Sequence, residues 1–202
     1  MTRPFFVLAS ASPRRLDLLN QIGLAPDLML AANIDESVRA AEQPRVYAER
    51  LAHEKAVASV ALLDPHYRAN PFLLLAADTV VAVGRRILPK AETEDQARFC
   101  LNILSGRAHR VTTALAVMTH DGRVHQRTVE TRLHVKRLSG PEVEHYIASG
   151  EWHGKAGGYA IQGLAAAFIS SISGSYSNVV GLPLYEAGQL LAGLGLSSRS
   201  AS

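Results

Sequence analysis

The chain has 202 residues, 48% of them hydrophobic, so it is long enough to bury a core and its composition excludes intrinsic disorder. The 21 basic residues nearly balance the 18 acidic ones and form no Lys/Arg-rich tract, which argues against nucleic acid as a partner and favours a small phosphorylated ligand. No segment approaches the ~20 apolar residues of a membrane span, so we expect a soluble, cytoplasmic protein.

The first expected elements are a strand and a helix joined by a short polar turn. The apolar run at residues 5–9 predicts a buried strand, and the pattern that follows predicts a helix over about residues 13–22, ending at Gly23. Pro13 suits the first helical position because its φ is already helical and its missing N–H needs no partner. Ser12 is then the expected N-cap.

The turn between these elements has the chemistry of an anion site. We expect the hydroxyls of Ser10 and Ser12 and the free N–H groups at the helix start to converge on one small volume. The guanidinium groups of Arg14 and Arg15 would converge on the same volume. Phosphate is the anion that fits best. The alternative is an ordinary capped helix with two surface arginines.

The next elements lead to a carboxylate behind a buried strand. Residues 28–31 predict a second strand, and residues 44–62 carry a helical period. The dense apolar run at residues 72–77 predicts a central strand buried on both faces, which places Asp78 and Thr79 at its C-terminal end. Ligands of open α/β sheets bind at such ends, so Asp78 is either a site residue or a cap.

The second half of the chain contains a hairpin and many glycines. The expected elements are a helix opened by Thr93 and closed by Ser105-Gly106, a hairpin of residues 111–118 and 124–134 around Asp121-Gly122, a short helix over residues 139–147, and a closing helix over residues 183–194. Cys100, the only cysteine, excludes an internal disulfide and is interpreted as buried helix filling. We expect the tail from Ser197 to be frayed.

Short motifs occur in order along nearly the whole chain. They are residues 8–15, Glu54-Lys55-Ala56, Ala77-Asp78-Thr79-Val80, Leu104-Ser105-Gly106 with His109 and Val111, residues 155–159 with Ile161-Gln162-Gly163, and Gly174-Ser175-Tyr176 with residues 179–183. This set resembles the Maf family of nucleoside triphosphate pyrophosphatases. The resemblance implies one Maf/ITPase-like domain over residues 1–202 with an α/β fold. Helices would flank an elongated mixed sheet, and a cleft would separate lobes of about residues 1–105 and 106–202.

The resemblance also implies the reaction and the base. Family members cleave nucleoside triphosphates between the α- and β-phosphates. Those acting on dTTP and UTP carry the arginine, threonine and glutamine found here as Arg14, Thr79 and Gln162. The Thr79 hydroxyl and the Gln162 amide would then face the pyrimidine edge. Members acting on 7-methyl-GTP typically carry tryptophan, glutamine and glutamate, so that substrate is the less favoured alternative.

The expected phosphate ligands come from both sides of the cleft. They are Ser10, Ser12, Arg14, Arg15, Lys55 and Lys90. Hydroxyls and guanidiniums would hold the phosphates, and the two lysines would neutralise their charge. The chain departs from the family at Lys90-Ala91, where proline usually follows the lysine.

The expected acidic residues serve the reacting water. Asp78 would act as general base or as a ligand of a divalent metal. Asp35 and Glu36 resemble the family's acidic segment that holds this ion together with Asp78, and the cation would be Mg²⁺ or Mn²⁺. Without the resemblance, Asp35-Glu36 is an ordinary loop or helix start.

The partner that we expect is a nucleoside triphosphate substrate, with neither nucleic acid nor membrane. A nucleotide-binding regulator of septum formation, with no significant turnover, is the alternative from another class. Asp78 argues against it, because a carboxylate beside a polyanion is repelled unless a metal or a reaction requires it. The apolar hairpin and the glycine-rich second half are compatible with a homodimer.

Overall fold

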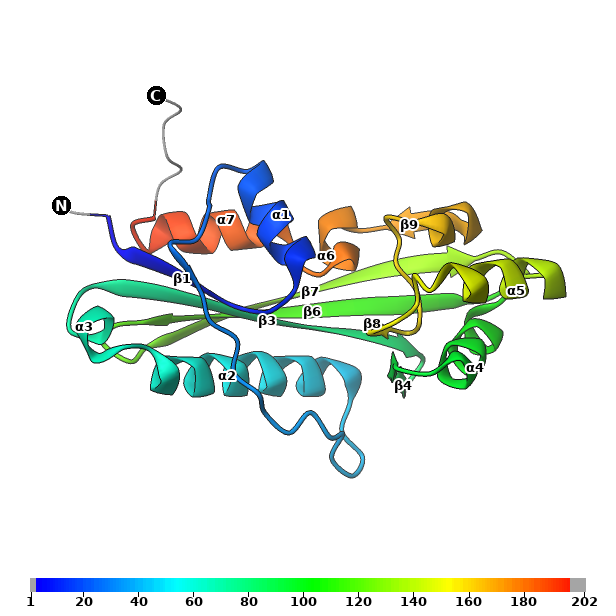
Figure 1. Ribbon diagram of the computed structural model, residues 1–202, viewed down its shortest axis with the longest axis horizontal. Helices are drawn as coiled ribbons and strands as arrows, with labels where there is room; N and C mark the ends of the chain where they lie inside the picture. Colours follow the sequence, from blue (N-terminus) through cyan, green and yellow to red (C-terminus); the bar gives the residue numbers. More distant parts are fainter. Residues whose placement is uncertain (1–2, 197–202) are drawn as a thin grey trace.

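One long mixed sheet organises residues 3–196, the part of the chain that the computed structural model describes (Figure 1). Its seven strands in spatial order are β2 (Leu28–Met29), β1 (Phe5–Ala9), β3 (Phe72–Val83), β6 (Ala108–Thr119), β7 (Val124–Val135) and β9 (Ile169–Ser173), with β4 (Arg86–Leu88) beside β3. β1 is parallel to both of its neighbours, and the other pairs are antiparallel. The predicted α/β fold with an elongated mixed sheet is confirmed. The tail from Ser197 lies outside the described residues.

Helices cover both faces of this sheet. They are α1 (Pro13–Gln21), α2 (Pro44–Leu62), α3 (Pro65–Arg68), α4 (Glu94–Leu104), α5 (Gly140–Ser149), a 3₁₀ turn (Leu164–Phe168), α6 (Tyr176–Val180) and α7 (Leu184–Gly193). In Figure 1 the long α2 lies below the sheet, while α1, α6 and α7 lie above it. A small second sheet pairs β5 (Lys90–Ala91) with β8 (Lys155–Ala156). Within residues 3–196 no helix combines the length and apolarity needed to cross a membrane.

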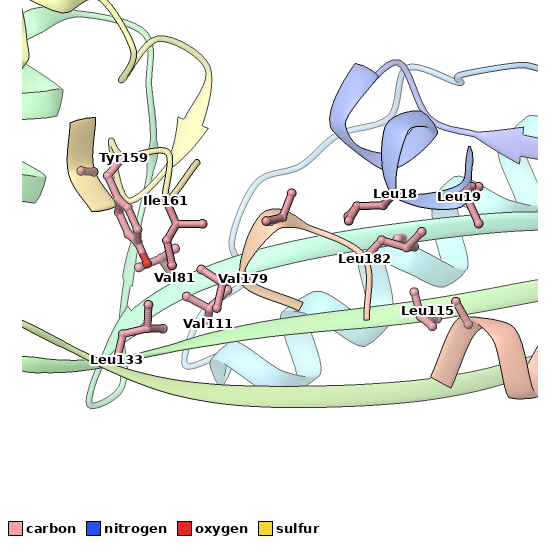
Figure 2. Close-up of a cluster of buried hydrophobic side chains, with 14 of the residues drawn as sticks. Leu18, Leu19, Val81, Val111, Leu115, Leu133, Tyr159, Ile161, Val179 and Leu182 are labelled. Atoms are coloured by element: carbon pink, nitrogen blue, oxygen red, sulfur yellow. The ribbon is translucent and has the colours of Figure 1, made fainter. Parts of the chain in front are cut away.

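β3 is buried on both faces, as its apolar run predicts. Leu73 and Leu75 belong to the cluster beneath α1 and α7, whereas Leu74 and Ala76 pack with α2. The α2 face of that contact consists largely of alanines, which allow the helix to approach the sheet closely. Figure 2 shows the first cluster, with Leu18 and Leu19 of α1 above the sheet, and Val81, Val179, Tyr159 and Ile161 gathered further along it.

Several elements follow their local signals closely. The expected helix over residues 44–62 matches α2, and α4 begins where the Thr93 hydroxyl accepts a hydrogen bond from the Gln96 N–H at 3.3 Å. The hairpin of β6 and β7 turns at Gly122, whose φ of +81° suits glycine. β6 also pairs with β3 from Ala82↔Arg110 to Leu73↔Thr119, so strands from before and after residue 105 share one sheet.

The predicted end of the central strand is wrong. β3 continues to Val83, which places Asp78 in the middle of the strand. The apolar, β-branched residues after Thr79 continue the strand pattern, and they pair with β6 on one edge and with β4 on the other. The expected second strand is also shorter, because only Leu28 and Met29 pair with β1.

Candidate functional site

The site lies at a gap in one edge of the main sheet. β1 pairs with β3 only as far as Ala9↔Ala76, and β4 joins the same edge at Val81↔Leu88. Residues 77–80 of β3 therefore have no strand partner on this edge. A cavity of about 350 Å³ opens there, lined by the turn between β1 and α1, by α2, by β3 and by the turn after α6. The sequence predicts a ligand-binding opening at the carboxyl end of β3. In the structure the opening lies at the carboxyl end of β1.

Asp78 and Glu36 are linked through lysines on the α2 side of the gap. Lys55 Nζ lies 2.5 Å from Asp78 Oδ1 and 2.7 Å from Glu36 Oε1. Lys90 forms a second ion pair with Glu36. Asp78 is only 4% exposed, so its charge requires this partner. The result is a row of alternating charges along the cavity wall, in the order Asp78, Lys55, Glu36 and Lys90.

The lysines also keep Glu36 ionised. Burial alone would raise the pKa of Glu36, but hydrogen bonds from Lys55 and Lys90, with their positive charges, outweigh it and lower the pKa below its ordinary value of 4.5. Glu36 is therefore a carboxylate at neutral pH.

Arg15 holds three segments of the site together. Its Nε donates to the Gly181 carbonyl at 2.8 Å, Nη1 to Ser10 Oγ at 3.1 Å and Nη2 to Thr79 Oγ1 at 3.2 Å. Burial lowers the pKa of Arg15, and the negative charge of Asp78 acts against that shift. Because several of its donors already bind the protein, Arg15 shapes the turn that carries Ser10 and offers few donors to a ligand.

Arg14 and Ser12 point free groups at the cavity. Arg14 has no hydrogen bond or ion pair within the described chain and lines the cavity, where burial lowers its pKa. Ser12 occupies the N-cap position of α1 as predicted, with Pro13 after it, but its hydroxyl makes no capping hydrogen bond. Both groups are available to a phosphate at the positive end of α1.

Thr79 presents its main chain, and not its hydroxyl, to the gap. The hydroxyl lies 3.0 Å from Thr113 Oγ1 and accepts from Arg15. The Phe5 N–H donates to the Pro71 carbonyl at 3.0 Å, which shows that odd-numbered residues of β3 direct their N–H and C=O groups towards the β1 edge. At Thr79 that edge is unpaired, so these groups are open to a ligand.

Two expected site residues lie away from the cavity wall. Gln162 is exposed and follows Ile161, whose side chain does line the cavity. The exposed Asp35 accepts hydrogen bonds from the Ser37 hydroxyl at 2.6 Å and the Ser37 N–H at 2.9 Å, which lower its pKa. Of the expected acidic pair, only Glu36 reaches the cavity.

The acidic residues that do meet fit a small divalent cation. Asp78 and Glu36 both contact the Lys55 ammonium, so their oxygens already surround one positive charge. Mg²⁺ in proteins is commonly held by one or two carboxylates and completed by substrate phosphates and water. Residues 3–196 contain no cluster of three or more His, Cys, Asp or Glu side chains placed to hold a metal ion.

The sequence interpretation missed the parts of the site that come from distant segments. The Gly181 carbonyl accepts a hydrogen bond from Arg15 across 166 positions of sequence, and no local sequence pattern predicts that contact.

A second cavity of about 330 Å³ shares Glu36, Asp78 and Lys90 with the first and adds Tyr47 of α2. His109 of the motif near residue 105 is buried, with Nε2 2.7 Å from the Tyr159 hydroxyl.

Comparison with known proteins gives consistent results. The family model described as "Maf-like protein" matches residues 5–194. A dTTP/UTP pyrophosphatase of Mesorhizobium japonicum is 57% identical over 189 residues, covering 94% of this chain and 91% of the relative. One from Caulobacter vibrioides is 57% identical over 192 residues, covering 95% and 96%. A solved HAM1 protein from Coxiella burnetii superposes with a TM-score of 0.50 at 14% identity over 93% of this chain and 98% of its own, which supports the fold alone.

Proposed function

This chain belongs to the Maf-like protein family, and from that membership we propose that it hydrolyses dTTP and UTP to the nucleoside monophosphate and pyrophosphate. The main support for this proposal is that one cavity brings the row Asp78–Lys55–Glu36–Lys90 together with the turn from Ser10 to Arg15. The curated relatives named for this activity are matched over nearly their full length.

The phosphates would bind on the side of the cavity formed by the start of α1. Arg14 supplies an uncommitted guanidinium, Ser12 a free hydroxyl, and the helix its positive end. Arg15 and Ser10 keep this turn in shape through their mutual hydrogen bond. Charge that develops on the leaving pyrophosphate would be met by Lys55 and Lys90.

Asp78 is the proposed general base. Its carboxylate lies at the gap, and the ion pair with Lys55 fixes its orientation. Water attacking the α-phosphorus would transfer its proton to Asp78. A divalent cation, Mg²⁺ or Mn²⁺, would be held by Asp78 and Glu36 and would supply Lewis-acid stabilisation of the phosphate oxygens. Ser10 is no nucleophile, because its oxygen accepts from Arg15 and from the Ser12 N–H.

Pyrimidine preference is proposed for the region around Arg14 and Thr79. The open N–H and C=O of Thr79 form an adjacent donor and acceptor, which complements the N3–H and O4 of uracil or thymine. Gln162 would have to swing from the surface to take part.

Because free nucleotides are the proposed substrates, we propose the cytoplasm as the place of action. No feature of the site favours a regulator without turnover.

The test is pyrophosphate release from dTTP, UTP, CTP, GTP and 7-methyl-GTP with Mg²⁺ or Mn²⁺. We expect dTTP and UTP to be hydrolysed fastest, and Asp78→Asn to lower the rate by about 10²–10⁴-fold, the usual contribution of a general base. The exposed Asp17→Asn on α1 is the matched control and should retain activity. Binding without turnover would contradict the enzyme, and turnover confined to 7-methyl-GTP would contradict the pyrimidine assignment.

A further inference from the structure

The segment that carries Glu36 into the site has little structure of its own. Residues 30–43 connect β2 to α2 and contain only a turn near residue 40. Glu36 nevertheless forms ion pairs with two lysines and lines both cavities. Something outside the segment must therefore hold its main chain in place.

Two side chains of α2 hold the segment at successive carbonyl groups. The Tyr47 hydroxyl donates to the Glu36 carbonyl at 2.7 Å, and Arg50 Nη2 donates to the Ser37 carbonyl at 3.0 Å. Tyr47 and Arg50 are three residues apart and thus share one face of the helix. Further along α2, Lys55 binds the carboxylate of Glu36. One helix thereby fixes both the main chain and the side chain of this residue.

Arg50 is itself held rigidly. Its Nε and Nη2 donate to the two oxygens of Glu42 at 2.6 and 2.8 Å, and its Nη1 donates to Glu54 at 3.0 Å. The Arg50 and Glu42 side chains are only 12% and 6% exposed. Glu42 also accepts from the Arg39 N–H at 3.0 Å, which closes the segment on itself. A bidentate, partly desolvated pair of this kind is directional and resists displacement.

These contacts differ from the other ion pair at the start of α2. Arg45 and Glu49 pair one helical turn apart at the surface, with the Arg45 side chain 66% exposed, and among the described residues no hydrogen bond or ion pair joins Arg45 to the segment. Such a pair contributes little to stability. The largely buried polar contacts of Tyr47 and Arg50 thus hold the stretch that carries Glu36, whereas the exposed Arg45–Glu49 pair does not.

We propose that Tyr47 and Arg50 are positioning residues for Glu36. They hold residues 36 and 37 against α2, so that the Glu36 carboxylate meets Lys55 and Lys90 at the wall between the two cavities. The effect of these residues on turnover rests on the proposed function. Their effect on the segment does not.

Tyr47→Phe is the central variant, because it removes one hydroxyl and leaves the ring in place. Hydrogen exchange of the amides at residues 34–38 should become about tenfold faster, the equivalent of one hydrogen bond, while exchange in β3 stays unchanged. Arg50→Gln should act in the same direction. Tyr67→Phe on the exposed Tyr67 of α3 and Arg45→Gln, whose side chain pairs with Glu49, are the controls.

A double-mutant cycle connects the segment to the site. Tyr47→Phe should lower kcat/KM for UTP about tenfold alone, but less than about twofold in a Glu36→Gln background, because the residue being positioned has then already lost its charge. Equal losses in both backgrounds, or unchanged exchange at residues 34–38, would overturn the proposal. If the native chain hydrolyses neither dTTP nor UTP, the proposed function fails, and the exchange measurement still decides the positioning role.

Discussion

At the scale of single residues, Lys55 has the largest influence on the site. Its ammonium lies within 2.7 Å of two carboxylates that belong to different elements. Removing one partner from a buried charge network leaves the others uncompensated, which costs more than the pair itself contributes.

Lys55→Met should therefore impair both catalysis and the ionisation of Glu36. We expect hydrolysis of UTP to fall about 10²–10³-fold, the usual effect of losing one charge-stabilising donor. The pKa of Glu36 should rise, because burial then acts against Lys90 alone. Steady-state kinetics and NMR titration of the glutamate carboxyls measure the two effects. Lys136→Met, which removes a surface pair with Glu142, is the control. A change of less than about threefold in rate would contradict the role.

Glu42 should make stability depend on pH. A hydrogen bond from Arg50 lowers the pKa of Glu42 from 4.5 to about 2. A carboxyl whose folded pKa is depressed stabilises the fold above its unfolded pKa, and the contribution is lost as pH falls through the folded value. The free energy of unfolding of the native chain should thus approach that of Glu42→Gln between about pH 4.5 and pH 2. Urea unfolding at several pH values measures this. A constant difference down to pH 2 would exclude the linkage.

At the scale of elements, the turn that follows β8 packs closely against β3. A Cβ on Gly157, at φ +67°, would lie 2.8 Å from Val81 Cγ1. Gly157 follows β8, and β8 pairs with the strand that carries Lys90. A larger residue here would force either Val81 or the turn after β8 to shift.

Gly157→Ala should be more destabilising than Gly154→Ala. Both positions have positive φ, but nothing lies within 4 Å of the Cβ at Gly154, so the difference isolates the contact with Val81. We expect the difference in free energy of unfolding to be about 1–3 kcal/mol, the usual cost of overpacking. Urea unfolding of the two variants checks it. Equal losses would mean that Val81 moves aside freely.

At the scale of the whole molecule, the shared sheet should make unfolding cooperative. β3 and β6 join residues on both sides of position 105, so the single domain expected over residues 1–202 should unfold in one step. Far-UV circular dichroism should lose signal together with the fluorescence of Trp152, which lies buried in the second half. Two separate transitions would instead favour independent lobes.

The homodimer stays a prediction. Comparing the mass of the protein in solution with the chain mass of 21.7 kDa decides it.

The sequence by itself determined the local features of this protein. Apolar periodicity and turn residues located the hairpin and the longer helices, though not α3, α6 or the 3₁₀ turn, and Pro13 with Ser12 located the start of α1. The motifs identified the family, and they marked Asp78, Lys55 and the polar turn, which do meet in one cavity. These features depend on residues that are neighbours along the chain, so a sequence pattern can record them.

Only the tertiary structure decided where the edges of the sheet lie and which polar groups reach the gap between them. Asp78 faces an open edge because β1 stops early, the Thr79 hydroxyl is bound by Arg15, and Glu36 reaches the site while Asp35 does not. Strand pairing and side-chain direction follow from contacts between segments far apart in sequence, such as Arg15 and Gly181. No local pattern encodes them, because the stabilising partner is absent until the chain has folded.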